Sequence, residues 1–162
     1  MNPTDSDIKS LYTVERKVRH IVMSMGEDVE YLFMNWAQTN VAVDRITKPT
    51  IVYILPPAGE LDFSWSSVKD YPDSEIAFMA KTDFDFDGSV NDGIIEAMKR
   101  LSIRFVRAIN GSGLFAPIEG KVRYQVVYDH LDDNVTGIIL TLPLIEEEGI
   151  IICDDIERKE DD

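Results

Sequence analysis

The sequence predicts an α+β fold: a mostly antiparallel sheet with helices packed on one face. An amphipathic helical segment comes first, strand-like segments follow in groups, and a second amphipathic helix separates the groups. Two of the strand-like segments, 120–129 and 135–144, are joined by a short turn, as in an antiparallel hairpin. Strands joined by hairpins, with helices between the groups, are typical of the α+β class.

The N-terminal segment predicts an amphipathic helix capped by Thr4 or Asp5. Its apolar residues recur at steps of three, four and one as far as Met25, and Gly26 then breaks or caps it. We expect a second helix over about 27–40. Alternatively, the glycine only interrupts one long helix, because periodicity alone does not separate the two arrangements.

Two strands are expected in the middle of the chain. Residues 50–55 are a β-branched and aromatic run bounded by prolines, which predicts a strand buried on both faces. Apolar and polar residues alternate over 75–86, which predicts a second strand. The segment 58–72 between them is loop-like, although Phe63 and Trp65 alternate there, so that a short edge strand is an alternative.

The clearest helix begins at a cap on Asn91 or Asp92 and ends at the glycine-rich stretch 110–113. Val122, Tyr124, Val126 and Tyr128 then alternate strictly with other residues, which predicts a strand with one buried face. We expect the apolar side of the helix to pack on this strand and the next one. The expected contacts join Ile95, Met98, Leu101 and Phe105 to Val122, Tyr124, Val126, Ile138 and Leu140.

Composition limits the classes of function. The length of 162 residues and an apolar fraction of 44% fit one domain, expected over 1–153, and an acidic, disordered tail over 154–162. A net charge of −14 disfavours nucleic-acid phosphates and anionic lipid as partners. We expect neither sequence-specific nucleic-acid binding nor a membrane, and the single Cys153 fits a reducing cytoplasm.

Asp83, Asp85 and Asp87 precede Gly88 as in the first half of a calcium-binding loop, D-x-D-x-D-G. Position 12 of such a loop must supply a bidentate glutamate, and here that position is Ile94. The preceding residues also resemble a strand rather than a helix. We therefore expect the three carboxylates to point to solvent and to bind no metal, the alternative being a weak or shared cation site.

No combination of residues predicts catalysis. His130 lies among acidic residues without the G-x-S-x-G turn of a serine hydrolase, and His20 lies on a helix surface. The glycines of 110–113 follow a helix, whereas a phosphate-binding loop would precede one. We expect no enzyme activity, no catalytic residue and no cofactor.

An aromatic patch is the strongest candidate for an interaction surface. Phe63, Trp65 and Tyr71 come from one loop, Trp36 is a further candidate, and tryptophan is enriched at interfaces. Alternatively, these side chains cover the sheet edge within the monomer. The acidic turn Asp132-Asp133-Asn134 is the second candidate surface.

The order of elements also points to a family. The N-terminal helix and middle strands precede a helix over 91–109, a strand over 121–128 and a closing strand over 136–142, with Asp133-Asn134-Val135-Thr136-Gly137 at the start of the last strand. From about residue 83 to 144, this arrangement resembles the tail-terminator and tail-completion proteins of tailed bacteriophages. The resemblance implies a ring at the head-proximal end of the tail tube that stops tube growth and joins the neck, without enzyme activity or cofactor.

The expected function is therefore that of a virion structural protein, a ring-forming tail terminator or neck component that connects head and tail. Its expected partners are copies of itself and phage tail-tube or neck proteins, and its expected location is the tail or neck of the virion, after synthesis in the host cytoplasm. An acidic surface suits a channel through which DNA must pass without sticking. The alternatives are a small acidic adaptor of a bacterial cell that acts through Trp65, and, behind it, a divalent-metal-dependent enzyme that uses Asp83, Asp85 and Asp87.

Overall fold

The computed structural model describes residues 3–43, 45–64, 68–81, 88–130 and 135–149. The helices are α1 (Asp5–Leu11), α2 (Val14–Ser24), α3 (Trp36–Val43) and α4 (Gly88–Ser112). The strands are β1 (Glu30–Met34), β2 (Thr50–Ile54), β3 (Gly59–Asp62), β4 (Lys69–Pro72), β5 (Ser74–Lys81), β6 (Tyr124–His130) and β7 (Val135–Leu142).

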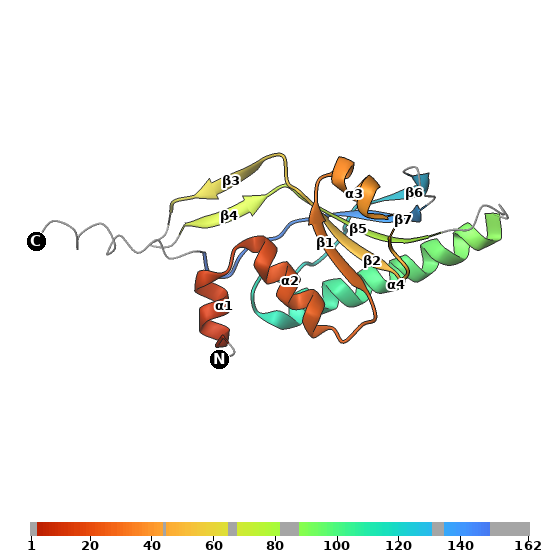
Figure 1. Ribbon diagram of the computed structural model, residues 1–162. Coiled ribbons are helices and arrows are strands. Elements are labelled where there is room, and N and C mark those ends of the chain that lie inside the picture. Colours follow the sequence, from red (N-terminus) through yellow and green to blue (C-terminus); the bar gives the residue numbers. More distant parts are fainter. Residues whose placement is uncertain (1–2, 44, 65–67, 82–87, 131–134, 150–162) are drawn as a thin grey trace, which may run out of the picture.

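The α+β class is confirmed. Within the described ranges, five strands form one sheet in the order β1-β2-β5-β7-β6, in which only β1 and β2 run parallel (Figure 1). The strands β3 and β4 form a separate antiparallel pair. The predicted β6–β7 hairpin is present, and the order of strands places β1 and β6 at the two edges of the sheet.

Two short helices replace the single N-terminal helix that the periodicity predicts. Thr4 caps α1, and its hydroxyl accepts a hydrogen bond from the Asp7 backbone amide at 3.2 Å. Thr13 has an extended backbone and caps α2 in the same way, accepting from the Arg16 amide at 3.2 Å. A threonine in this role satisfies an otherwise unpaired amide and so starts a new helix. Gly26, with φ of +67°, follows α2 as expected.

The expected helix over 27–40 was wrong in its first half. Residues 30–34 pair in parallel with β2, from Glu30 opposite Thr50 to Met34 opposite Ile54. Tyr31 and Phe33 pack toward one face of the sheet, whereas Leu32 and Met34 pack toward the other. An edge of β2 that is open to pairing outweighs the weak helical spacing of this segment, because strand propensity depends strongly on its neighbours.

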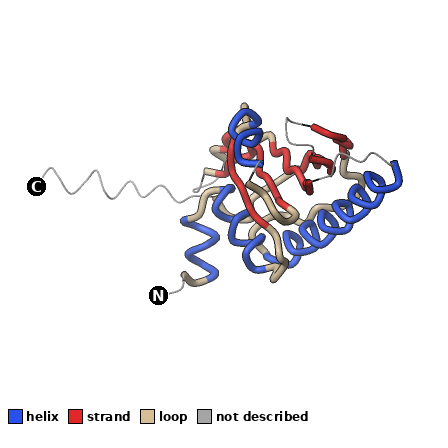
Figure 2. The backbone as a smooth tube through the Cα atoms, turned by 45° about the vertical axis from the view of Figure 1, so that its right-hand side comes forward, coloured by secondary structure: helices blue, strands red, loops and turns tan. Residues whose placement is uncertain are grey.

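Apolar clusters cover both faces of the sheet. On one face, residues of β2, β5 and β7 pack against α1, α2 and α4; on the other, Val52, Ala77 and Met79 lie in a smaller cluster to which Trp36 of α3 adds (Figure 2). Burial of β2 on both faces is thereby confirmed. The helices α1, α2 and α4 share one face, as predicted, whereas Trp36 of α3 packs on the other face, which the sequence did not predict.

The contacts of α4 follow the prediction in part. Ile95, Met98, Leu101 and Phe105 are buried, and the Phe105 ring meets Phe78 of β5 edge-on at 5.5 Å between centroids. The helix begins at Gly88, ahead of the expected cap on Asn91 or Asp92, and Gly113 ends it with φ of +69°.

Two residues predicted for the core are exposed. Tyr124 and Val126 lie opposite Leu140 and Ile138, and this register places them on the α4 side of the sheet. Their exposed fractions are nevertheless 48% and 37%. The reason is that β6 is an edge strand, so α4 covers it incompletely.

Candidate interaction surface

A two-stranded hairpin projects from the body of the protein. β3 and β4 pair from Gly59 opposite Pro72 to Asp62 opposite Lys69, in a sheet of their own. Figure 1 shows this hairpin extending away from the five-stranded sheet. We call the described residues of this hairpin, 59–64 and 68–72, the arm. The sequence predicts a loop or a short edge strand here, and the structure has instead two strands that pair with each other.

The two strands meet closely at the base of the arm. The Asp73 amide donates a hydrogen bond to the Ala58 carbonyl at 2.9 Å, just outside the first strand pair. At Gly59, a Cβ atom would lie 2.9 Å from both the Tyr71 carbonyl oxygen and the Pro72 Cα. Real Cβ atoms do not approach backbone so closely, so a side chain at this position would force the two strands of the arm to shift locally.

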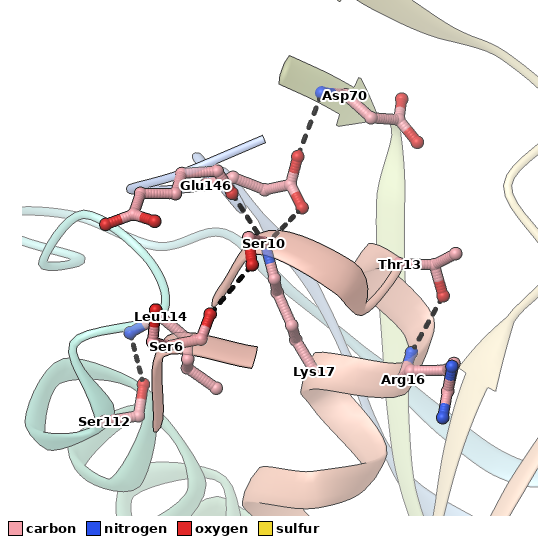
Figure 3. Close-up of polar contacts among 10 residues, drawn as sticks. Ser6, Ser10, Thr13, Arg16, Lys17, Asp70, Ser112, Leu114 and Glu146 are labelled. Carbon is pink, nitrogen blue, oxygen red and sulfur yellow. Dashed lines mark hydrogen bonds and ion pairs between the residues drawn. The ribbon is translucent and has the colours of Figure 1, made fainter. Parts of the chain in front are cut away.

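A buried ion pair fastens the arm to α2. Lys17 Nζ lies 2.6 Å from Glu146 Oε1, and the two side chains are 0% and 1% exposed. Lys17 also donates to the Glu148 carbonyl at 2.8 Å, and the Asp70 amide of the arm donates to Glu146 Oε2 at 3.1 Å (Figure 3). The two charges are thus paired and hydrogen-bonded, which is the condition for keeping charges in a protein interior.

The segment that carries Glu146 is itself held on both sides. The Ala116 amide donates to the Ile145 carbonyl at 2.7 Å, and the Glu147 amide donates to the Leu114 carbonyl at 3.1 Å. On the other side, a Cβ at Gly149 would overlap the Val68 carbonyl. The chain after β7 therefore lies between the end of α4 and the arm, and it joins the arm to the core.

The Lys17–Glu146 pair was not predicted from the sequence, although one of its two residues stands out in the apolar pattern. Lys17 lies between Val14, Val18 and Ile21 on the buried side of α2, and a lysine in an apolar stripe indicates a buried partner. Glu146 left no signal, because it is one of three consecutive glutamates and its partner lies 129 positions away.

The arm exposes large apolar side chains. Phe63 is 71% exposed and Leu61 is also exposed, so Phe63 does not cover the sheet edge within the protomer. Tyr71, the second predicted residue in the described part, is half-buried. Desolvation of the Tyr71 hydroxyl raises its pKa above the usual value, and the negative charge of Asp62 raises this pKa further. Trp36 packs with the second core cluster and does not join these residues.

A groove of about 690 Å³ opens at the base of the arm. The groove is lined by residues at the ends of β2 and β7 and by residues near the base of the arm. The exposed apolar residues Leu55 and Ile145 belong to this lining. Three carboxylates, those of Glu60, Asp73 and Glu75, also line it. The surface around the arm is therefore both apolar and acidic.

Several predicted residues lie outside the described part of the chain. These are Trp65, the turn Asp132-Asp133-Asn134, the aspartates 83, 85 and 87, and the tail 154–162. Within the described ranges, no group of three or more His, Cys, Asp or Glu side chains could hold a metal ion. No helix among the described residues is long and apolar enough to cross a membrane.

No protein-family model, curated protein or solved structure matches this chain. The function is therefore inferred from the arm, its attachment and the charges around it.

Proposed function

We propose that the protein is a virion structural protein of a tailed bacteriophage that forms a ring as a tail terminator or as a head–tail connection component. The order of elements described above, which resembles that family, supports the proposal. The observation that carries it is the arm, an attached hairpin that extends from the body and exposes Leu61 and Phe63.

The arm has the properties of an assembly element. An isolated two-stranded hairpin is at best marginally stable in water. Here the Lys17–Glu146 pair, which accepts a hydrogen bond from the Asp70 amide, and the close contact between Val68 and Gly149 hold its base to the core. When a partner covers the exposed apolar side chains of such an element, their removal from water favours association.

A ring of such protomers suits passage of DNA. Contacts in a ring join two different surfaces of each protomer, and the arm supplies one of them. The chain carries a net charge of −14, and a negative surface does not retain the phosphate backbone. The protein's role is thus to close the tube and to leave its channel open.

The test is the mass and shape of the purified full-length chain. We expect light scattering and negative-stain microscopy to show closed rings, either alone or after addition of tail-tube or neck proteins from the same phage. A protein that stays monomeric under all these conditions contradicts the proposal.

The acidic groove at the base of the arm favours a second candidate, a small adaptor that binds a basic, apolar segment of a bacterial protein. The same measurements separate the two candidates. A one-to-one complex of fixed mass with such a segment, in the absence of any ring, supports the adaptor.

A further inference from the structure

The charges of the chain are distributed very unevenly. Residues 59–73, the arm and its base, contain four acidic residues and one basic residue. Residues 97–127, from the second half of α4 into β6, contain six basic residues and one acidic residue, within a chain of net charge −14. The protein thus presents two regions of opposite charge.

The basic region carries exposed apolar side chains. Lys99 Nζ lies 5.1 Å from the centroid of the Tyr124 ring, which places α4 beside β6 at this point. Ile103 is one turn further along the same side of α4 and is exposed. Val126 follows Tyr124 on the same side of the strand and is also exposed. Ile103, Tyr124 and Val126 thus form an apolar strip across the junction of α4 and β6.

Two exposed arginines flank this strip. Arg100 and Arg107 lie three residues before and four after Ile103, so both are its neighbours on the helix surface. Both are exposed, and neither forms an ion pair with any residue that the structure describes. Lys99, in contrast, pairs with Glu96 at 3.2 Å. We call Lys99, Arg100, Ile103, Arg107, Tyr124 and Val126 the basic face.

The arm has the complementary pattern. Leu61 and Phe63 are two residues apart and exposed, so they share one side of the arm. Glu60, which alternates with them, and Asp73 at the base are also exposed and belong to the other side of the hairpin. The arm therefore combines exposed apolar residues with carboxylates, as the basic face combines exposed apolar residues with guanidinium groups.

We infer that the arm of one copy of this chain docks on the basic face of the next copy. The inference rests on the proposed ring, and it identifies the two surfaces that meet between neighbouring copies. In Figure 1 the arm and β6 lie toward opposite ends of the molecule, so the contact joins different surfaces of the two copies. A head-to-tail contact of this kind repeats from copy to copy and closes into a ring when the rotation permits. Complementary charge also sets the orientation of the partners.

The sharpest test mixes two variants that are each blocked on one side. Phe63→Ser removes the apolar anchor of the arm, and Ile103→Asp places a carboxylate in the strip of the basic face. We expect each variant alone to associate at least about tenfold more weakly than the natural chain. Mixed together, they should form a one-to-one dimer and nothing larger, because a single intact arm meets a single intact basic face.

Charge reversal provides an independent test. Arg100→Glu with Arg107→Glu should weaken association, and so should Glu60→Lys with Asp73→Lys. All four substitutions in one chain should restore association to within about tenfold of the natural value, because opposite charges face each other again. Restoration would not occur if these residues lay in unrelated surfaces.

Met23→Ser is the matched control, since Met23 is exposed on α2 outside both surfaces. Association should be unchanged in this variant, and thermal unfolding should show every variant to be folded. If Phe63→Ser and Ile103→Asp each form the same rings as the natural chain, the inference is overturned and the proposed function still stands. Loss of rings in Phe63→Ser alone indicates arm-to-arm contacts and also overturns it. A natural chain that stays monomeric with every tail or neck protein overturns both.

Discussion

The two antiparallel hairpins of this protein are stabilised in different ways. β6 and β7 belong to the five-stranded sheet, and β7 is buried along almost its whole length. Among the described residues, β3 and β4 pair only with each other, and no apolar side chain that the structure describes in the arm lies in either core cluster. The sheet hairpin is held by apolar burial, whereas the arm is held at its base by an ion pair and close backbone contacts.

The difference shows how a small domain supports a projecting element. The arm contributes little to the core, so its exposed residues are free to suit a partner. Its base must still be rigid, because a hairpin alone is marginally stable. The buried Lys17–Glu146 pair supplies this rigidity at a position where an apolar contact would not hold the Asp70 amide.

The largest effect is expected in the core that supports the sheet hairpin. Phe105→Ala should lower the free energy of unfolding by about 3–5 kcal/mol, because it leaves a cavity beside Phe78. Urea denaturation measures this loss. Ile103→Ala, on the exposed side of the same helix, should change stability by less than about 0.5 kcal/mol. A loss below about 1 kcal/mol for Phe105→Ala would mean that α4 is not packed as described.

Breaking the ion pair should test the attachment of the arm. Lys17→Met leaves the Glu146 carboxylate buried without its cation, and the expected loss is about 3 kcal/mol. The double variant Lys17→Met with Glu146→Gln should recover part of that loss, because no buried charge remains. Arg19→Met, which breaks the more exposed pair with Glu15, should cost no more than about 1 kcal/mol. If Lys17→Met and the double variant lost the same free energy of unfolding, the buried unpaired charge would not be the cause of the loss.

The same substitution in the two hairpins sharpens the comparison. At Gly137 of β7 a Cβ would overlap the Phe78 carbonyl, so Gly137→Ala should separate β7 from β5 and cost about 1–3 kcal/mol globally. Gly59→Ala should cost about 1 kcal/mol or less, because its strain is local to the arm. Hydrogen exchange should show faster exchange of the Asp73 amide in Gly59→Ala and little change in β7.

The smallest effect on stability is expected at the exposed part of the arm. Phe63→Ser should change the free energy of unfolding by less than about 0.5 kcal/mol, because the ring is already in water. Thermal unfolding of the protein at low concentration checks this. A large loss would show that Phe63 supports the fold and is not free to serve a partner.

The sequence by itself determined the elements whose burial pattern is local. Helix α4 and the β6–β7 hairpin follow from the periodicity of their apolar residues, since a repeat of two or of 3.6 places one set of side chains on one side. Strand β2 follows from a continuous β-branched and aromatic run bounded by prolines. A cap at Thr4 or Asp5 was predicted, and the structure has Thr4 in that role. The break at Thr13 was missed because the apolar stripe continues across it.

Only the tertiary structure decided the features that depend on distant partners. β1 is a strand because the edge of β2 is open to pairing. Tyr124 is exposed because α4 covers the edge strand β6 incompletely. The arm is held by Lys17 and Glu146, which are 129 positions apart, and no local pattern connects them. Periodicity reports which side of an element is apolar, but coverage of that side and the pairing of a buried charge depend on how the whole chain packs.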